Sequence, residues 1–162
     1  MTVLVNHPGV LYARVSSKEQ EQGYSIPAQQ ELLRPYAGQM GVGIAEEFLD
    51  VETAKTTGRP GFAAMVGYLK RHRECRVVLV EKTDRLYRNF KDYVTLDELD
   101  LDIQFVKENC ILNKESRSSE KLVHGIKVLM AKNYIDNLSE EVRKGLRTKQ
   151  DFSSARAKTR SR

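Results

Sequence analysis

Short apolar runs alternate with amphipathic helical patterns along the first two thirds of this chain. Residues 77–81, which begin Val-Val-Leu-Val, form the clearest pattern of a buried strand. Further strands are predicted at residues 10–15, 44–50 and 103–106, and helices at residues 27–41, 60–71 and 93–99. Because strands and helices that alternate in this way build parallel sheets, the sequence predicts an α/β fold with a mainly parallel sheet flanked by helices.

Two positions interrupt these regular patterns. The chain is expected to leave the sheet at Ser16, because the polar run that follows, up to Tyr24, cannot continue a buried strand. Pro27 suits the first turn of the helix at 27–41, but Pro35 lies in its middle. An internal proline removes a backbone hydrogen bond at a cost of about 3 kcal/mol, so we expect this helix to be kinked or split.

A different pattern begins near residue 120. Residues 120–149 contain no proline, and their apolar side chains recur every three to five positions, which predicts one long amphipathic helix of roughly 40 Å. We therefore expect an α/β domain at residues 1–119, a helix at 120–149 that packs on another surface, and a disordered basic tail at 150–162.

Charge and composition narrow the class of protein. The 162 residues include 27 Lys and Arg against 22 Asp and Glu, a net charge of +5 that favours a polyanionic partner. No apolar stretch is long enough to cross a bilayer, so we expect a cytoplasmic protein that does not bind membranes. The two cysteines, Cys75 and Cys110, lack the spacing of a zinc site and are expected to be reduced.

Two groups of polar residues follow predicted strands and are candidates for chemistry. Arg14 and Ser16 lie two apart, so their side chains share one face at the end of a strand, and residues 82–88 follow the strand at 77–81. Arg85 and Arg88 are three apart and could address one anion from the same face of a helical turn. Ligands of open α/β sheets bind at such strand ends.

Guanidinium groups match phosphate oxygens, and a hydroxyl beside several of them could attack phosphorus while they stabilise the transition state. Ser16 is the hydroxyl best placed for this role. Each group also has an ordinary structural explanation, since a serine after a strand is commonly a turn or cap residue and Asp-Arg-x-x-Arg is commonly a solvated ion-pair face. Neither a Walker glycine loop nor a Gly-x-Ser-x-Gly elbow is present.

Four segments carry a resemblance to a known family, namely YARVSSKEQ, SIPAQQ, TGRPGF and EKTDRLYRN, in this order. Together they resemble the catalytic domain of serine recombinases, the resolvase and invertase family, over roughly residues 9–150. The later segment AKNYIDNLSEEVRKGL resembles large serine recombinases and transposon or phage integrases more than small resolvases.

The resemblance implies site-specific DNA recombination through a 5′-phosphoserine intermediate, with Ser16 as the nucleophile and double-stranded DNA as the partner. It implies phosphate-binding roles for Arg14, Arg59, Arg85 and Arg88, an active-site role for Asp84, and supporting roles for Gln20, Gln29 and Lys82. It also implies that no metal, nucleotide or other cofactor takes part. Helix 120–149 would build the homodimer and the synaptic homotetramer.

Two alternatives remain open at this point. Nothing after residue 150 resembles the DNA-binding part of a recombinase, so the chain could be a truncated, non-catalytic fragment that oligomerises or binds DNA nonspecifically. A nucleotide-binding module would also fit the predicted sheet, but it would leave the arginine cluster unexplained.

Overall fold

A computed structural model describes residues 7–53, 55, 58–130 and 143–145, and its centre is a five-stranded sheet. The strands are β1 (His7–Ser16), β2 (Val42–Glu52), β3 (Val77–Val80), β4 (Asp102–Phe105) and β5 (Cys110–Leu112), in the order β2-β1-β3-β4-β5. All neighbouring strands are parallel except β4 and β5. This confirms the predicted fold class, and the short antiparallel β5 is an addition that the sequence analysis did not predict.

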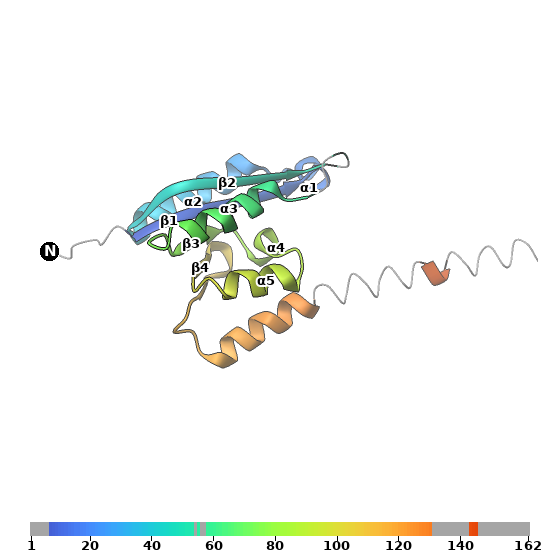
Figure 1. Ribbon diagram of the computed structural model, residues 1–162. Coiled ribbons are helices and arrows are strands. Elements are labelled where there is room, and N and C mark those ends of the chain that lie inside the picture. Colours follow the sequence, from blue (N-terminus) through green and yellow to red (C-terminus); the bar gives the residue numbers. More distant parts are fainter. Residues whose placement is uncertain (1–6, 54, 56–57, 131–142, 146–162) are drawn as a thin grey trace, which may run out of the picture.

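Helices cover both faces of the sheet (Figure 1). They are α1 (Ser17–Glu21), α2 (Ile26–Met40), α3 (Pro60–Arg71), α4 (Thr83–Leu86) and α5 (Phe90–Asp97), with a 3₁₀ turn at Val106–Glu108 and a further helix over residues 118–130. The bounds of α3 match the prediction, whereas α5 begins three residues earlier than predicted. The helical turns α1 and α4 lie where loop or turn residues were expected.

Strand β1 forms the centre of two hydrophobic clusters because its side chains alternate between the two faces of the sheet. On one face Leu11 packs with Leu33 of α2, and on the other Tyr12 packs with Phe62 and Met65 of α3. All five side chains are buried, and full burial of a Leu, Phe or Met side chain contributes about 1.5–3 kcal/mol. Packing on both faces therefore holds the end of β1 in place.

Pro35 does not split α2, which is one helix over Ile26–Met40. The proline is exposed, while Leu33 and Ala37 on either side of it are buried against the sheet. Water can therefore reach the carbonyl group that loses its hydrogen bond, and packing of the buried face keeps the helix continuous. The helix ends at Gly41, whose φ of 66° is the left-handed conformation that glycine adopts without strain.

The start of α3 lies unusually close to the end of β2. A Cβ atom on Gly61 would be 2.6 Å from the Leu49 carbonyl oxygen, so only glycine fits there. The Asp50 carboxylate accepts hydrogen bonds from the backbone N–H groups of Gly61 (2.7 Å) and Phe62 (2.8 Å). This contact places Arg59, the N-cap residue of α3, beside the carboxyl ends of the strands.

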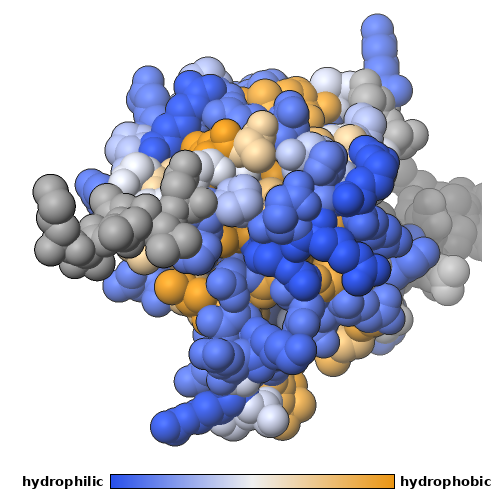
Figure 2. Space-filling model, turned by 60° about the vertical axis from the view of Figure 1, so that its left-hand side comes forward, coloured by the Kyte–Doolittle hydropathy of each residue, from blue (hydrophilic) through white to orange (hydrophobic). Residues whose placement is uncertain are grey.

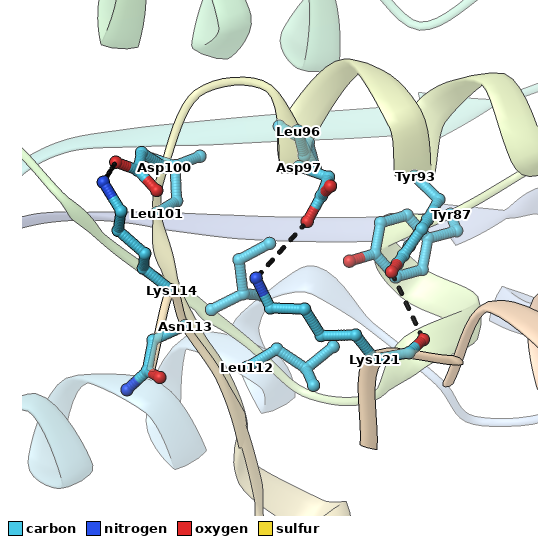
Figure 3. A pocket seen from close by; sticks show the side chains of 11 residues that line it. Tyr87, Tyr93, Leu96, Asp97, Asp100, Leu101, Leu112, Asn113, Lys114 and Lys121 are labelled. Carbon is cyan, nitrogen blue, oxygen red and sulfur yellow. Dashed lines mark hydrogen bonds and ion pairs between the residues drawn. The ribbon is translucent and has the colours of Figure 1, made fainter. Parts of the chain in front are cut away.

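The helix over residues 118–130 packs beside α5 (Figure 1). The pocket drawn in Figure 3 lies between α5, the end of β5 and this helix, and two ion pairs border it: Lys121 with Asp97 (3.9 Å) and Lys114 with Asp100 (3.0 Å). The helix begins two residues before the predicted start. The rest of the predicted helix 120–149, apart from residues 143–145, and the tail at 150–162 lie outside the described residues.

The surface at the end of the sheet where β1 begins is mainly hydrophilic (Figure 2). Among the helices that the structure describes, none has the length and apolar character needed to cross a membrane. Cys75 is buried and Cys110 is half-buried, and neither forms a disulfide.

Candidate active site

The candidate residues meet at the carboxyl ends of β1 and β3. Ser16 is the last residue of β1, and α4 begins at Thr83, three residues after the end of β3. Because β1 and β3 are adjacent and parallel, both segments open at the same edge of the sheet. The register pairs Ser16 with Glu52 at the end of β2.

Ser16 is the N-cap of α1. Its hydroxyl oxygen accepts a hydrogen bond from the Glu19 backbone N–H (3.3 Å), and its own backbone N–H donates to the Glu19 carboxylate (2.7 Å). These reciprocal bonds form a capping box, which holds the backbone of the half-buried Ser16 in an extended conformation. Ser16-x-x-Glu19 is a sequence signature of this box, so α1 could have been predicted in place of a loop.

Arg85 lies inside the protein, with a side chain only 1% exposed. Its guanidinium pairs with the carboxylates of Glu19 and Glu81, and Glu81 also pairs with Lys107 (2.5 Å). Partial burial opposes ionisation of Glu19, but the hydrogen bond from Ser16 and the charge of Arg85 outweigh it and lower the pKa of Glu19. A charged carboxylate thus connects the serine turn to a buried arginine.

Arg14 is held by several fixed acceptors. Its guanidinium donates to the backbone carbonyl oxygens of Asp84 (2.6 Å) and Arg85 (3.2 Å), and to the carboxylate of Glu52 (3.2 Å). The side-chain amide of Gln29, from α2, bonds both the backbone N–H and the carbonyl oxygen of Arg14. Gln29 therefore binds the backbone of β1 and orients Arg14.

Arg88 differs from Arg85 in exposure and in partner. The helix α4 ends at Leu86, and Tyr87 is extended, so Arg88 does not share a helical turn with Arg85. Its side chain is 52% exposed and pairs with the same Glu52 carboxylate that Arg14 contacts (3.2 Å). Contrary to the prediction, Arg85 and Arg88 therefore do not lie on one face of a helical turn.

Arg59 reaches the same edge from α3. It donates to the Tyr12 hydroxyl oxygen (2.8 and 3.1 Å), to the Leu86 carbonyl oxygen (2.6 Å) and to the Asp92 carboxylate (2.7 Å). The Tyr12 hydroxyl in turn donates to Asp50 (2.7 Å), and burial raises the pKa of Tyr12. Asp92 also accepts the backbone N–H of Arg88, which connects two of the predicted arginines.

The remaining predicted residues lie at the periphery. The Asp84 side chain is exposed and pairs with Lys82 (3.5 Å), whose ammonium lies 5.6 Å from the centre of the Tyr24 ring. Gln20 is exposed on α1, and its side chain makes no hydrogen bond to another described residue. Within the described part of the chain, no guanidinium donates to the Ser16 hydroxyl, and each of the four arginines instead contacts a carboxylate or a carbonyl oxygen.

The chain matches the family model described as "Resolvase, N terminal domain" over residues 9–151. This match spans nearly the whole sequence. The chain belongs to the resolvase family. No curated protein sequence matches it.

Solved structures of resolvase-family catalytic domains share the fold. A resolvase family site-specific recombinase from Streptococcus pneumoniae is 23% identical with a TM-score of 0.62, over 83% of this chain and 93% of that one. The N-terminal catalytic domain of TP901-1 integrase is 24% identical with a TM-score of 0.57, over 80% and 96%. The catalytic domain of ISC1926 TnpA, an IS607-like serine recombinase, is 26% identical with a TM-score of 0.51, over 74% and 78%. The predicted family, the serine recombinases, is confirmed.

Acidic residues of this resolvase-family site were not predicted from the sequence. They hold the arginines in place: Glu19, Glu52, Glu81 and Asp92, together with Asp50 acting through Tyr12. Glu81 follows a strand directly, and an acidic residue that is almost fully buried requires a basic partner, so its pairing with Arg85 four residues later was the clearest available signal.

Proposed function

We propose that this domain is the catalytic unit of a site-specific recombinase, in which Ser16 cleaves and rejoins double-stranded DNA. The observation that carries the proposal is the position of the Ser16 hydroxyl at a strand end where four arginines from three segments lie around one edge of the sheet. Such a cluster of guanidinium groups suits a phosphodiester, since each guanidinium group can bind two of its oxygens.

The reaction is a transesterification. The Ser16 oxygen forms a bond to phosphorus as the bond from phosphorus to the 3′ oxygen breaks, and the serine proton ends, in net terms, on the released 3′ hydroxyl. The 5′ phosphate stays joined to Ser16, and attack by a 3′ hydroxyl of another strand reverses the step. Atoms and charge balance without a co-reactant.

The roles implied by the resemblance can be assigned to residues at this edge. Arg14 and Arg88 are the arginines best placed to bind the phosphate, because both contact Glu52, the register partner of Ser16, and Arg88 is exposed. Arg85 and Arg59 are more enclosed and would stabilise negative charge from within the site. Asp84, Lys82 and Gln20 would contact DNA at the rim, and Gln29 would orient Arg14.

Assembly would place two such sites on DNA. We propose that helix 120–149 mediates the homodimer and the synaptic homotetramer. Support comes from its described part, where large apolar side chains are exposed: Leu122, Val123, Ile126, Leu129 and Met130. Exposed apolar stripes of this kind mark interaction surfaces.

The test is formation of a covalent protein–DNA adduct on a supercoiled plasmid library that carries random sequence, analysed on denaturing gels. Ser16→Ala should abolish the adduct, but it also removes the N-cap of α1. Ser16→Asn is the better variant, because asparagine caps helices as well as serine does and has no hydroxyl group. Ser17→Ala, which removes an exposed neighbouring hydroxyl, should retain the adduct. DNA binding without any adduct would instead favour a nonspecific DNA-binding fragment.

A further inference from the structure

One carboxylate at the centre of the site holds two of the arginines. The Glu52 Oε2 atom lies 3.2 Å from Nη1 of Arg14, and the Oε1 atom lies 3.2 Å from Nη1 of Arg88. Glu52 is also the register partner of Ser16 across the parallel pair β1 and β2. The carboxylate therefore lies between the two most accessible arginines, on the strand next to the candidate nucleophile.

The two arginines differ in their freedom to leave Glu52. Arg14 is also bound to two backbone carbonyl oxygens, so its guanidinium has a fixed direction. Arg88 has an exposed side chain, and Glu52 is the only acidic group it pairs with in the described residues. The geometry thus pairs one fixed cation with one that can move.

The contact between Glu52 and Arg88 is incomplete. Oε1 of Glu52 is buried and accepts no hydrogen bond from any described residue, although Arg88 lies within ion-pair distance. A buried carboxylate oxygen without a hydrogen bond is costly, because it has lost water without gaining a donor. An anion that satisfied both guanidinium groups better than Glu52 does would therefore replace it readily.

We propose that Glu52 occupies the position of a DNA phosphate in the DNA-free protein, and that a phosphate must displace it from Arg14 and Arg88 before Ser16 can react. This inference rests on the proposed function and assigns Glu52 as an internal competitor of the substrate. Carboxylate and phosphate suit the same place because both offer two oxygens to the guanidinium fork. Repulsion between the two anions then moves Glu52 away once the phosphate is bound.

A competitor role and a purely structural role of Glu52 predict opposite changes in phosphate affinity when Glu52 is replaced. If Glu52 only stabilised the site, its removal would weaken phosphate binding by releasing both arginines. As a competitor, its removal strengthens binding. The variants for the test are Glu52→Gln, which removes the charge, and Glu52→Asp, which keeps the charge but shortens the side chain so that it cannot span both arginines.

The experiment titrates the full chain with inorganic phosphate and follows the Nε–H resonances of Arg14 and Arg88 by NMR. Glu52→Gln should bind phosphate about three- to tenfold more tightly than the wild type, and Glu52→Asp should show a smaller gain without any change in net charge. The matched control is Glu21→Gln, an exposed residue of α1 near the same edge, which should change affinity less than about twofold.

A double-variant cycle separates the proposed contact from general electrostatics. In an Arg88→Gln background, the gain from Glu52→Gln should shrink, whereas two independent charge effects would add. Equal or weaker phosphate binding in both Glu52 variants, or a gain no larger than that of Glu21→Gln, would overturn the inference.

The adduct assay allows the competitor role of Glu52 to be judged separately from the proposed recombinase function. Tighter phosphate binding in the Glu52 variants without a Ser16 adduct in the wild type would support the competitor role and count against recombinase chemistry. Adducts in the wild type with no gain in the Glu52 variants would overturn the competitor role alone. Thermal unfolding of each variant confirms that the compared proteins are folded.

Discussion

The Glu19 carboxylate accepts a 2.7 Å hydrogen bond from the backbone N–H of Ser16. The same carboxylate pairs with the buried guanidinium of Arg85, so one side chain connects the turn that carries the candidate nucleophile to the segment that follows β3. The positions of Ser16 and Arg85 are therefore coupled through Glu19.

Glu19→Ala removes both contacts and should lower the free energy of unfolding by about 1–2 kcal/mol, because a cap bond and a partner of Arg85 are lost. Adduct formation should slow by about tenfold or more, since the serine turn loses its fixed geometry. Glu19→Gln preserves the capping box and should retain most of the stability. Urea unfolding and timed adduct gels measure the two effects, with Glu21→Ala as the control in the same helix. Equal rates in Glu19→Ala and the control would contradict the coupling.

Tyr12→Phe tests how Arg59 is held. The variant removes the hydroxyl that accepts two bonds from Arg59 and donates to Asp50, while the ring still packs on Phe62. We expect a loss of about 1–3 kcal/mol in unfolding free energy, because buried hydrogen-bonding groups lose a partner. Adduct formation should slow more than stability alone explains, which single-turnover rates under fully folded conditions would reveal. An unchanged rate would show that Leu86 and Asp92 suffice to position Arg59.

Gly61→Ala should be strongly destabilising for steric reasons. The added Cβ would meet the Leu49 backbone at 2.6 Å, and backbone atoms cannot yield as a flexible side chain can. The expected cost is about 1–3 kcal/mol, with α3 displaced from β2. Gly67→Ala in the same helix is the matched control and should stabilise by about 0.5–1 kcal/mol, since its nearest neighbour is the end of the Arg71 side chain. Thermal or urea unfolding of both variants provides the comparison.

His124 should make the protein sensitive to mild acid. Burial among the rings of Tyr87, Tyr93 and Phe105 lowers its pKa below the usual 6.5, with Glu108 opposing and Lys127 reinforcing the shift. The unfolded chain then binds the proton more readily, so the stability contributed by neutral His124 is complete above pH 6.5 and is lost as the pH falls towards its folded pKa. The unfolding free energy of His124→Leu should therefore fall less between pH 7 and pH 5 than that of the wild type. Parallel pH dependences would contradict this.

The sheet and its main helices could be predicted because their residues obey simple periodicity. Strand β3 is apolar throughout, and α3 begins at a proline and places Phe62, Met65 and Leu69 on one face. The strand β5 could not be predicted, because three residues are too few to show an alternating hydrophobic pattern. Its pairing with β4 also depends on tertiary contacts. The split at Pro35 did not occur, because the residue lies on the exposed face of α2, where water can bind the carbonyl oxygen that loses its hydrogen bond.

The residue types at the strand ends allowed the candidate site to be located, but its internal arrangement could not be predicted. The sequence places Arg85 and Arg88 three apart, yet the end of α4 between them sends one inward and leaves the other exposed. The two arginines pair with Glu19, Glu52 and Glu81, which lie on three separate segments that come together at one edge of the sheet. The spacing of residues along the chain does not predict these contacts.

Tyr87 separates the inner arginine from the outer one, and its ring lies against His124 of the helix over residues 118–130. The ring is almost fully enclosed and also contacts Tyr93 and Phe105. Aromatic rings in contact transmit displacement between the elements that carry them. A force applied along the helix would therefore reach the backbone between Arg85 and Arg88 through a single side chain.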